Sequence, residues 1–191
     1  PAVFSADPNV ARDAHPILTL NYDQLLEMTY WGAKVLHYRS VELAKRRNVL
    51  LYIGPASQKT EEGTWVREEK TMFETAKILA INSHERVLEV HSGKLSAAEG
   101  IDLMRGFFDE REIAFPQILQ VLQSDSKVQF YLTGPGEILS PIEKEIPQAK
   151  GLKLSPEKLC SVTATCTGSS SPDVVQKVLR ALEKNQVPVH T

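Results

Sequence analysis

Several features are scarce in this chain, and each scarcity argues against a class of protein. The 191 residues carry 22 Lys and Arg against 24 Asp and Glu, with no basic block, so the composition gives no reason to expect nucleic acid as a partner. No apolar run approaches the roughly 20 residues that cross a bilayer, and no charged-then-apolar signal segment is present. Together with a hydrophobic fraction of 42%, these absences indicate an ordinary globular protein, expected in the cytoplasm and away from membranes.

Cysteine is also scarce. Cys160 and Cys166 lie in one short stretch at a spacing that matches no metal-binding or redox pattern. We therefore interpret them as packing residues on one face of a strand, and we expect no metal site. An initiating Met is missing as well, and the opening stretch PAVFSADPNV resembles the interior of a longer protein. We expect the chain to be a middle-to-late segment of such a protein.

The first third of the chain combines helical patterns with one strand pattern. Residues 22–31 predict a helix with a partly apolar face, and residues 33–48 predict a second one. Residues 49–53 form a short apolar run that is typical of a buried strand. A charged stretch that begins at residue 67 is interpreted as the start of a linker.

A different rhythm begins at residue 86. It predicts a strand over 86–92, a helix over 95–112 with a capping box of Ser96 and Glu99, and strands over 115–123 and 127–133. A helix over 136–150, interrupted by Pro141, completes a β-α-β-β-α order. A strand over 159–167, a helix over 171–185 and the start of another strand at 186–191 follow. We therefore expect two similar α+β units, the second of them incomplete.

Four motifs occur in order along the first block: SADPN (5–9), TLNYDQLLEM (19–28), GAKVLH (32–37) and GT (63–64). In these motifs the chain resembles the aspartokinase family, and the units after residue 85 resemble the paired ACT regulatory modules of that family. The resemblance implies the end of an α/β amino-acid-kinase domain over 1–66 and a linker over 67–85. It further implies ferredoxin-like (βαββαβ) ACT modules, the first over 86–155 and a partial second over 156–191.

The resemblance implies transfer of phosphate from ATP, held with Mg²⁺, to the side-chain carboxylate of aspartate, the first step towards lysine, threonine and methionine. In the family, a Lys-Phe-Gly-Gly-type segment holds the phosphates and the aspartate, and this chain has none. We therefore expect this chain alone to be inactive and to hold no tightly bound cofactor, and we assign no catalytic residue.

By matching motifs, the resemblance places Phe4, Asp7, Asn9, Lys34 and Val35 at nucleotide-contacting positions. Phe4 stands where the family often has Tyr, and Asn9 stands where many members have Arg. Other readings remain open for two of them: Asp7 also suits an ordinary Asp-Pro turn, and Lys34 a solvated helix lysine. His37 is interpreted as a packed or capping residue without a catalytic role.

The resemblance also implies an amino-acid effector, lysine or threonine, bound at the interface between two ACT modules through turns of the first module, and a homo-oligomer formed through these modules. In the turn that follows the first strand, the candidates are Ser92, Gly93 and Lys94. In the LQSDSK segment, Ser124 and Asp125 match a Ser-Glu pair of the family. The alternative reading of this segment is a plain hairpin turn.

Two other functions remain open at this point. The first is a stand-alone ACT-type protein that binds amino acids or oligomerises without kinase chemistry. The second is another relative of the carbamate and amino-acid kinases, although those enzymes generally lack the downstream paired modules. The SADPN, GAKVLH and GT series favours the aspartokinase interpretation, because a pure sensor would not need it.

Overall fold

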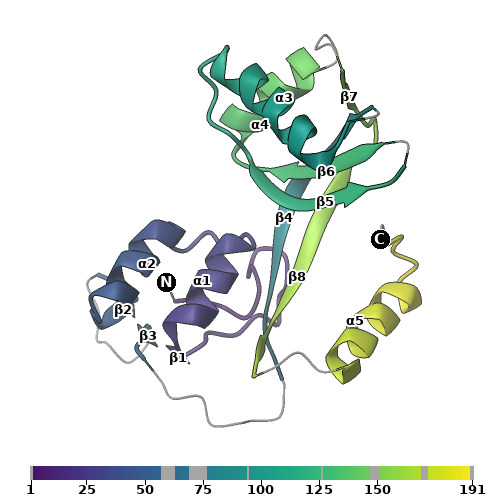
Figure 1. The fold of residues 1–191 in the computed structure, drawn as a ribbon. Helices are drawn as coiled ribbons and strands as arrows, with labels where there is room; N and C mark the ends of the chain where they lie inside the picture. The colour runs from purple at the N-terminus through teal and green to yellow at the C-terminus, as the bar shows by residue number, and fades with distance from the viewer. Residues whose placement is uncertain are drawn as a thin grey trace. The chain divides into compact units, whose positions relative to one another are not determined.

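The computed structural model of the chain describes residues 2–56, 63–68, 77–93, 95–125, 127–146, 151–168 and 172–189. The chain divides into two compact units: unit 1 comprises residues 1–83 and 162–191, and unit 2 comprises residues 84–161. Among the described residues, no helix has the length and apolar character that a membrane crossing requires. The mixed α/β fold class predicted from the sequence is confirmed (Figure 1).

Unit 2 is a four-stranded antiparallel sheet with two helices. Its elements are β4 (Lys77–Ser92, of which residues 84–92 belong here), α3 (Ala97–Asp109), β5 (Gln117–Gln123), β6 (Val128–Thr133), α4 (Gly136–Glu145) and β7 (Leu152–Leu154). The strand order is β5-β6-β4-β7, so the first and third strands of the unit lie at the centre. This is the βαββαβ arrangement of a ferredoxin-like sandwich.

The core of unit 2 explains why both helices cover the same face of the sheet (Figure 1). Alternate residues of the central strands, such as Leu88 and Val90 on β4 and Phe130 on β6, point to one side. The apolar stripes of α3 and α4 close over them. The buried core residues are Leu88, Val90, Met104, Phe107, Phe108, Val128, Phe130, Leu132, Leu139, Ile142, Ile146 and Leu152.

A close contact fixes α3 against this sheet. Gly100 lies on the first turns of α3, and a Cβ atom at this position would meet the Phe130 ring at 2.7 Å and Ser92 Oγ at 3.1 Å. Because real Cβ atoms do not approach so closely, only glycine permits this spacing between helix and sheet. The start of α3 is thereby held close to the end of β4.

Unit 1 contains a small three-stranded sheet, three helices and the outer parts of two long strands. The elements are β1 (Thr19–Leu20), α1 (Tyr22–Tyr30), α2 (Tyr38–Arg46), β2 (Leu51–Ile53), β3 (Thr64–Val66), β8 (Leu159–Thr167) and α5 (Pro172–Lys184). The sheet order is β1-β3-β2, and β8 pairs with β4. The core of the unit consists of Val3, Ile17, Leu20, Tyr22, Leu25, Met28, Val41, Ala44, Val66 and Ala80.

The helix predicted over 22–31 is confirmed, but the one predicted over 33–48 is too long. Gly32 takes a left-handed φ of 109°, and the chain continues in turns until α2 begins at Tyr38. His37 caps that helix, since its Nδ1 accepts a hydrogen bond from the Arg39 amide at 3.3 Å. The capping role considered for His37 is therefore confirmed, and Lys34 lies in a turn rather than on a helix.

Other predicted elements differ in extent or in environment. The strand predicted over 49–53 covers only residues 51–53 and is half-buried rather than buried, because it forms an edge of its sheet. Residues 77–85 belong to the long strand β4, although the sequence suggested a linker there. Pro141 does not interrupt α4, which continues through it with Leu139 and Ile142 buried on either side. Residues 186–189 form no strand, since Gln186 turns the chain with a φ of 55°.

Candidate functional site

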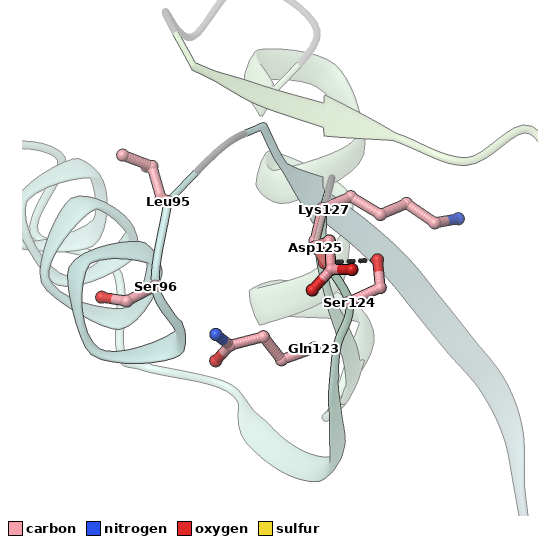
Figure 2. Close-up of a pocket in the computed structure, with 6 residues that line it drawn as sticks. All are labelled: Leu95, Ser96, Gln123, Ser124, Asp125 and Lys127. Atoms are coloured by element: carbon pink, nitrogen blue, oxygen red, sulfur yellow. Dashed lines mark hydrogen bonds between the residues drawn. The ribbon is translucent and has the colours of Figure 1, made fainter.

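A pocket of about 450 Å³ opens on unit 2 where two turns approach each other. One wall is the segment between β4 and α3, and the other is the hairpin between β5 and β6 (Figure 2). The lining residues are Leu95, Ser96, Gln123, Ser124, Asp125 and Lys127. The βαββαβ topology brings both turns to the same end of the sheet, because β4 and β6 are antiparallel neighbours.

The hairpin wall is ordered by its own hydrogen bonds. The Ser124 amide donates to the Lys127 carbonyl at 2.9 Å, and the Ser124 hydroxyl donates to the same oxygen at 3.2 Å (dashed in Figure 2). The Ser124 side chain is therefore occupied in the turn. Asp125 is exposed at the tip, and no hydrogen bond to its carboxylate is found among the described residues. Asp125 and Lys127 thus place an acidic and a basic side chain on one rim of the pocket.

The other wall contains the start of α3, where a capping box holds two of the first amides. Ser96 Oγ accepts a hydrogen bond from the Glu99 amide at 3.3 Å, and the Glu99 carboxylate accepts one from the Ser96 amide at 2.8 Å. The capping box predicted from the sequence is confirmed. The pKa of the Glu99 carboxyl is lowered. The hydrogen bond from the Ser96 amide is the larger cause, and a hydrogen bond with the Ser96 side chain is the second. This helix end therefore already carries one negative charge.

One hydrogen bond crosses the pocket. Gln123, the last residue of β5, reaches from the hairpin towards α3 (Figure 2), and its Oε1 accepts a hydrogen bond from the Ala97 amide at 3.2 Å. Gln123 and Lys127 were not predicted as site residues. Gln123 directly precedes the Ser-Asp pair in the LQSDSK segment and Lys127 follows it after one residue, so their place in the hairpin is the signal that could have identified them.

The predicted effector residues are distributed unevenly around this pocket. Ser124 and Asp125 line it. Ser92 is fully buried on the helix-facing side of β4, and its Oγ has no hydrogen-bond partner among the described residues. Gly93 is exposed, and its carbonyl accepts a hydrogen bond from the Leu95 amide at 2.8 Å. Lys94 lies outside the described residues.

The predicted nucleotide residues on the N-terminal loop lie in unit 1. Phe4 bridges to Pro16, and the Ser5 carbonyl accepts a hydrogen bond from the Ile81 amide of β4 at 2.8 Å. Asp7 Oδ1 accepts hydrogen bonds from the Asn9 amide at 2.8 Å and from Asn9 Nδ2 at 3.0 Å. Asp7 therefore forms the Asp-Pro turn that the sequence offered as its other reading, and Asn9 is its partner.

A second cavity, of about 420 Å³, lies between this loop and β4. Asp7 lines it, whereas Phe4, Asn9, Lys34 and Val35 do not. Lys34 is exposed in the turn before α2, and Val35 packs against the core of unit 1. Of the five candidates, Asp7 alone lines this cavity. Within the described residues, no group of three His, Cys, Asp or Glu side chains could hold a metal ion.

The chain was compared with known proteins by sequence and by fold. No protein-family model matches the chain. The chain is 36% identical to Aspartokinase 2 of Bacillus subtilis over 90 residues, which is 47% of this chain and 22% of that protein. It is 32% identical to the aspartokinase of Helicobacter pylori over 136 residues, which is 69% of this chain and 33% of that protein. The chain belongs to the aspartokinase family.

Solved aspartokinase structures share the fold. Escherichia coli aspartokinase III, solved in complex with aspartate and ADP, superposes with a TM-score of 0.70 at 20% identity over 96% of this chain and 42% of its own. The Clostridium acetobutylicum aspartate kinase gives a TM-score of 0.66 at 18% identity. The resemblance inferred from the motifs is thus confirmed. The chain spans between a fifth and a third of the two curated aspartokinases compared above.

Proposed function

We propose that the chain is the amino-acid-sensing region of an aspartokinase and that unit 2 binds a free amino acid, lysine or threonine, in the pocket between Ser96 and Asp125. The observation that carries the proposal is the convergence of two turns of a βαββαβ unit on one pocket whose rim holds side chains of opposite charge. One relative in fold, Escherichia coli aspartokinase III, has been solved in complex with lysine and aspartate.

The chemistry of the pocket suits a zwitterion. The Asp125 carboxylate offers a charge-assisted hydrogen bond to the α-ammonium group or, for lysine, to the side-chain ammonium group. Lys127 and the amides at the start of α3 offer the positive potential that a carboxylate requires. A free amino acid therefore finds both of its charges matched within one cavity of about 450 Å³.

We further propose that the parent enzyme transfers phosphate from ATP to the side-chain carboxylate of aspartate, as the first step towards lysine, threonine and methionine. Phe4, Asp7, Asn9, Lys34 and Val35 would contribute one wall of its nucleotide site. The Asp7 carboxylate repels phosphate unless a cation such as Mg²⁺ lies between them, so this wall alone fits ATP poorly. A cytoplasmic homo-oligomer formed through the ACT-type modules completes this proposal.

One observation favours a second candidate, a non-catalytic ACT-type protein that binds amino acids or mediates oligomerisation. All six lining residues belong to unit 2, so the pocket needs no residue of the kinase-like segment. This candidate predicts effector binding as well, and it differs from the first in predicting no kinase activity in any longer form of the protein.

Thermal unfolding of the 191-residue chain tests effector binding directly. Lysine at about ten times its dissociation constant should add about 1.4 kcal/mol to the free energy of unfolding and raise the Tm by about 3–6 °C. Asp125→Asn should abolish the shift, because it removes the partner of the ammonium group. Asp109→Asn, the same change at the far end of α3, should leave the shift intact. No shift with millimolar lysine or threonine would contradict the proposal.

A further inference from the structure

We propose that Gln123 is a built-in plug of the amino-acid pocket: its side-chain amide occupies the helix end that the carboxylate of the ligand must take, and the ligand must displace it. The inference rests on the proposed function of this pocket and adds a residue that sets its affinity. It starts from a hydrogen bond between the two walls of the cavity, from the Ala97 amide to Gln123 Oε1 at 3.2 Å.

The hydrogen-bond donors at the start of α3 show why this contact matters. Four amides there have no partner within the helical ladder, those of Ser96, Ala97, Ala98 and Glu99. The Ser96 and Glu99 amides are satisfied inside the capping box. The Ala97 amide is satisfied by Gln123, which belongs to another element, and the Ala98 amide has no acceptor among the described residues. Displacement of Gln123 therefore presents two consecutive amides, Ala97 and Ala98, to the pocket.

Two consecutive amides at a helix end suit the two oxygens of a carboxylate. A carboxylate forms charge-assisted bonds that are about twice as strong as the bond from a neutral amide oxygen. The contact of Gln123 is also exposed to water, so its net contribution is small. A ligand carboxylate can therefore replace the Gln123 oxygen, but the ligand binds more weakly by the amount that this displacement costs.

The charge of the neighbouring residues explains why the plug is an amide. Glu99 already places a carboxylate at this helix end, and its pKa is lowered there. A second fixed carboxylate at position 123 would hold the same amides with a charge-assisted bond and would repel the ligand. The neutral Gln123 side chain satisfies the Ala97 amide when no ligand is bound, and a ligand carboxylate can still replace it.

The test uses two variants of the 191-residue chain that shift affinity in opposite directions. Isothermal titration with L-lysine and with L-threonine should show that Gln123→Ala binds the amino acid about fivefold more tightly, the factor equivalent to a net hydrogen bond of about 1 kcal/mol. Gln123→Glu should bind it about tenfold more weakly, because the Glu carboxylate would form a stronger, charge-assisted bond to the Ala97 amide and would repel the ligand carboxylate. Gln176→Ala, the matched change on the exposed surface of α5, should bind like the unaltered chain.

Each outcome decides between the alternatives. If both variants at position 123 weaken binding, Gln123 is a ligand-contacting residue, and the plug is refuted. If neither variant changes binding, the contact is incidental, and the plug is again refuted while the proposed function stands. If no protein in the set binds either amino acid, the proposed function fails, and the plug fails with it. If only Gln123→Ala binds, the plug is supported in its strongest form.

Discussion

At the scale of the residue, Gly100 decides how closely α3 lies on its sheet. A side chain at this position would overlap the Phe130 ring, which is fully buried and cannot move aside without disturbing the core. Gly106, on the same helix, has no atom within 4 Å of the corresponding position. The two glycines therefore have different reasons to be present, and they form a natural pair for comparison.

We expect Gly100→Ala to lower the free energy of unfolding by about 1–2 kcal/mol, because overpacking costs about 1–3 kcal/mol and the better helix propensity of Ala returns part of it. Gly106→Ala should instead raise the free energy of unfolding by about 0.5–1 kcal/mol, because only the propensity changes there. Urea unfolding of both variants provides the measurement. Equal effects at the two positions would mean that the close contact with Phe130 does not constrain the helix.

Individual site residues were only partly predictable. The sequence indicated Ser124 and Asp125 by likeness to a family pair, and the hairpin does carry them to the pocket. Ser92 was selected by its place in a turn, but strand alternation turns its side chain towards the core beside Gly100. Gln123 was missed because its bond to Ala97 joins residues 26 positions apart, and no local pattern reveals such a contact.

At the scale of the element, the capping box of α3 makes this helix sensitive to acid. The hydrogen bond from the Ser96 amide lowers the pKa of Glu99 below its ordinary value of 4.5. A carboxyl whose pKa is lower in the folded state stabilises the fold above the unfolded pKa and loses that contribution as the pH falls through the folded pKa.

We therefore expect Glu99→Gln to reduce the acid sensitivity of the chain. The unaltered chain should lose stability as the pH falls from about 5 towards 3, whereas the variant should show a shallower loss over the same range and lower stability at pH 7. Urea unfolding at a series of pH values measures both curves. Parallel curves would show that the contact between Ser96 and Glu99 does not persist in solution.

Strong local signals made most elements predictable. The helix over 97–109 and the hairpin of β5 and β6 carried a capping box and a polar turn between apolar runs. The errors occurred where tertiary packing overrode a local rule, as in α4, where burial of Leu139 and Ile142 holds the helix together across Pro141. The strands β1 and β7 were missed because they are only two and three residues long.

At the scale of the whole molecule, we expect the 191-residue chain to show no aspartate-dependent turnover of ATP. It lacks the Lys-Phe-Gly-Gly-type segment that the aspartokinase resemblance associates with the phosphates, and of its candidate nucleotide residues only Asp7 lines the cavity beside the N-terminal loop. A coupled assay of ADP release, with and without aspartate, measures this. Robust turnover that depends on aspartate would show that phosphate binding needs only the residues present here.

The sequence pattern and the compactness of the structure divide the chain differently. The sequence suggested consecutive segments with boundaries at residues 66, 85 and 155, whereas compactness groups residues 84–161 as one unit between the two parts of the other. Strand β4 runs from residue 77 to 92, so the boundary between the units falls within one continuous strand. The assignment of these units to kinase and ACT-type modules remains a prediction.

In the sequence, unit 2 lies between the two parts of unit 1, and this order has a consequence for the synthesis of the chain. A ribosome adds about 5–20 residues per second, so it synthesises the 78 contiguous residues of unit 2 before α5 and most of β8. Unit 2 is therefore complete in the nascent chain while the C-terminal part of unit 1 is still missing. Chaperones that bind exposed apolar surface would act mainly on unit 1 during that time.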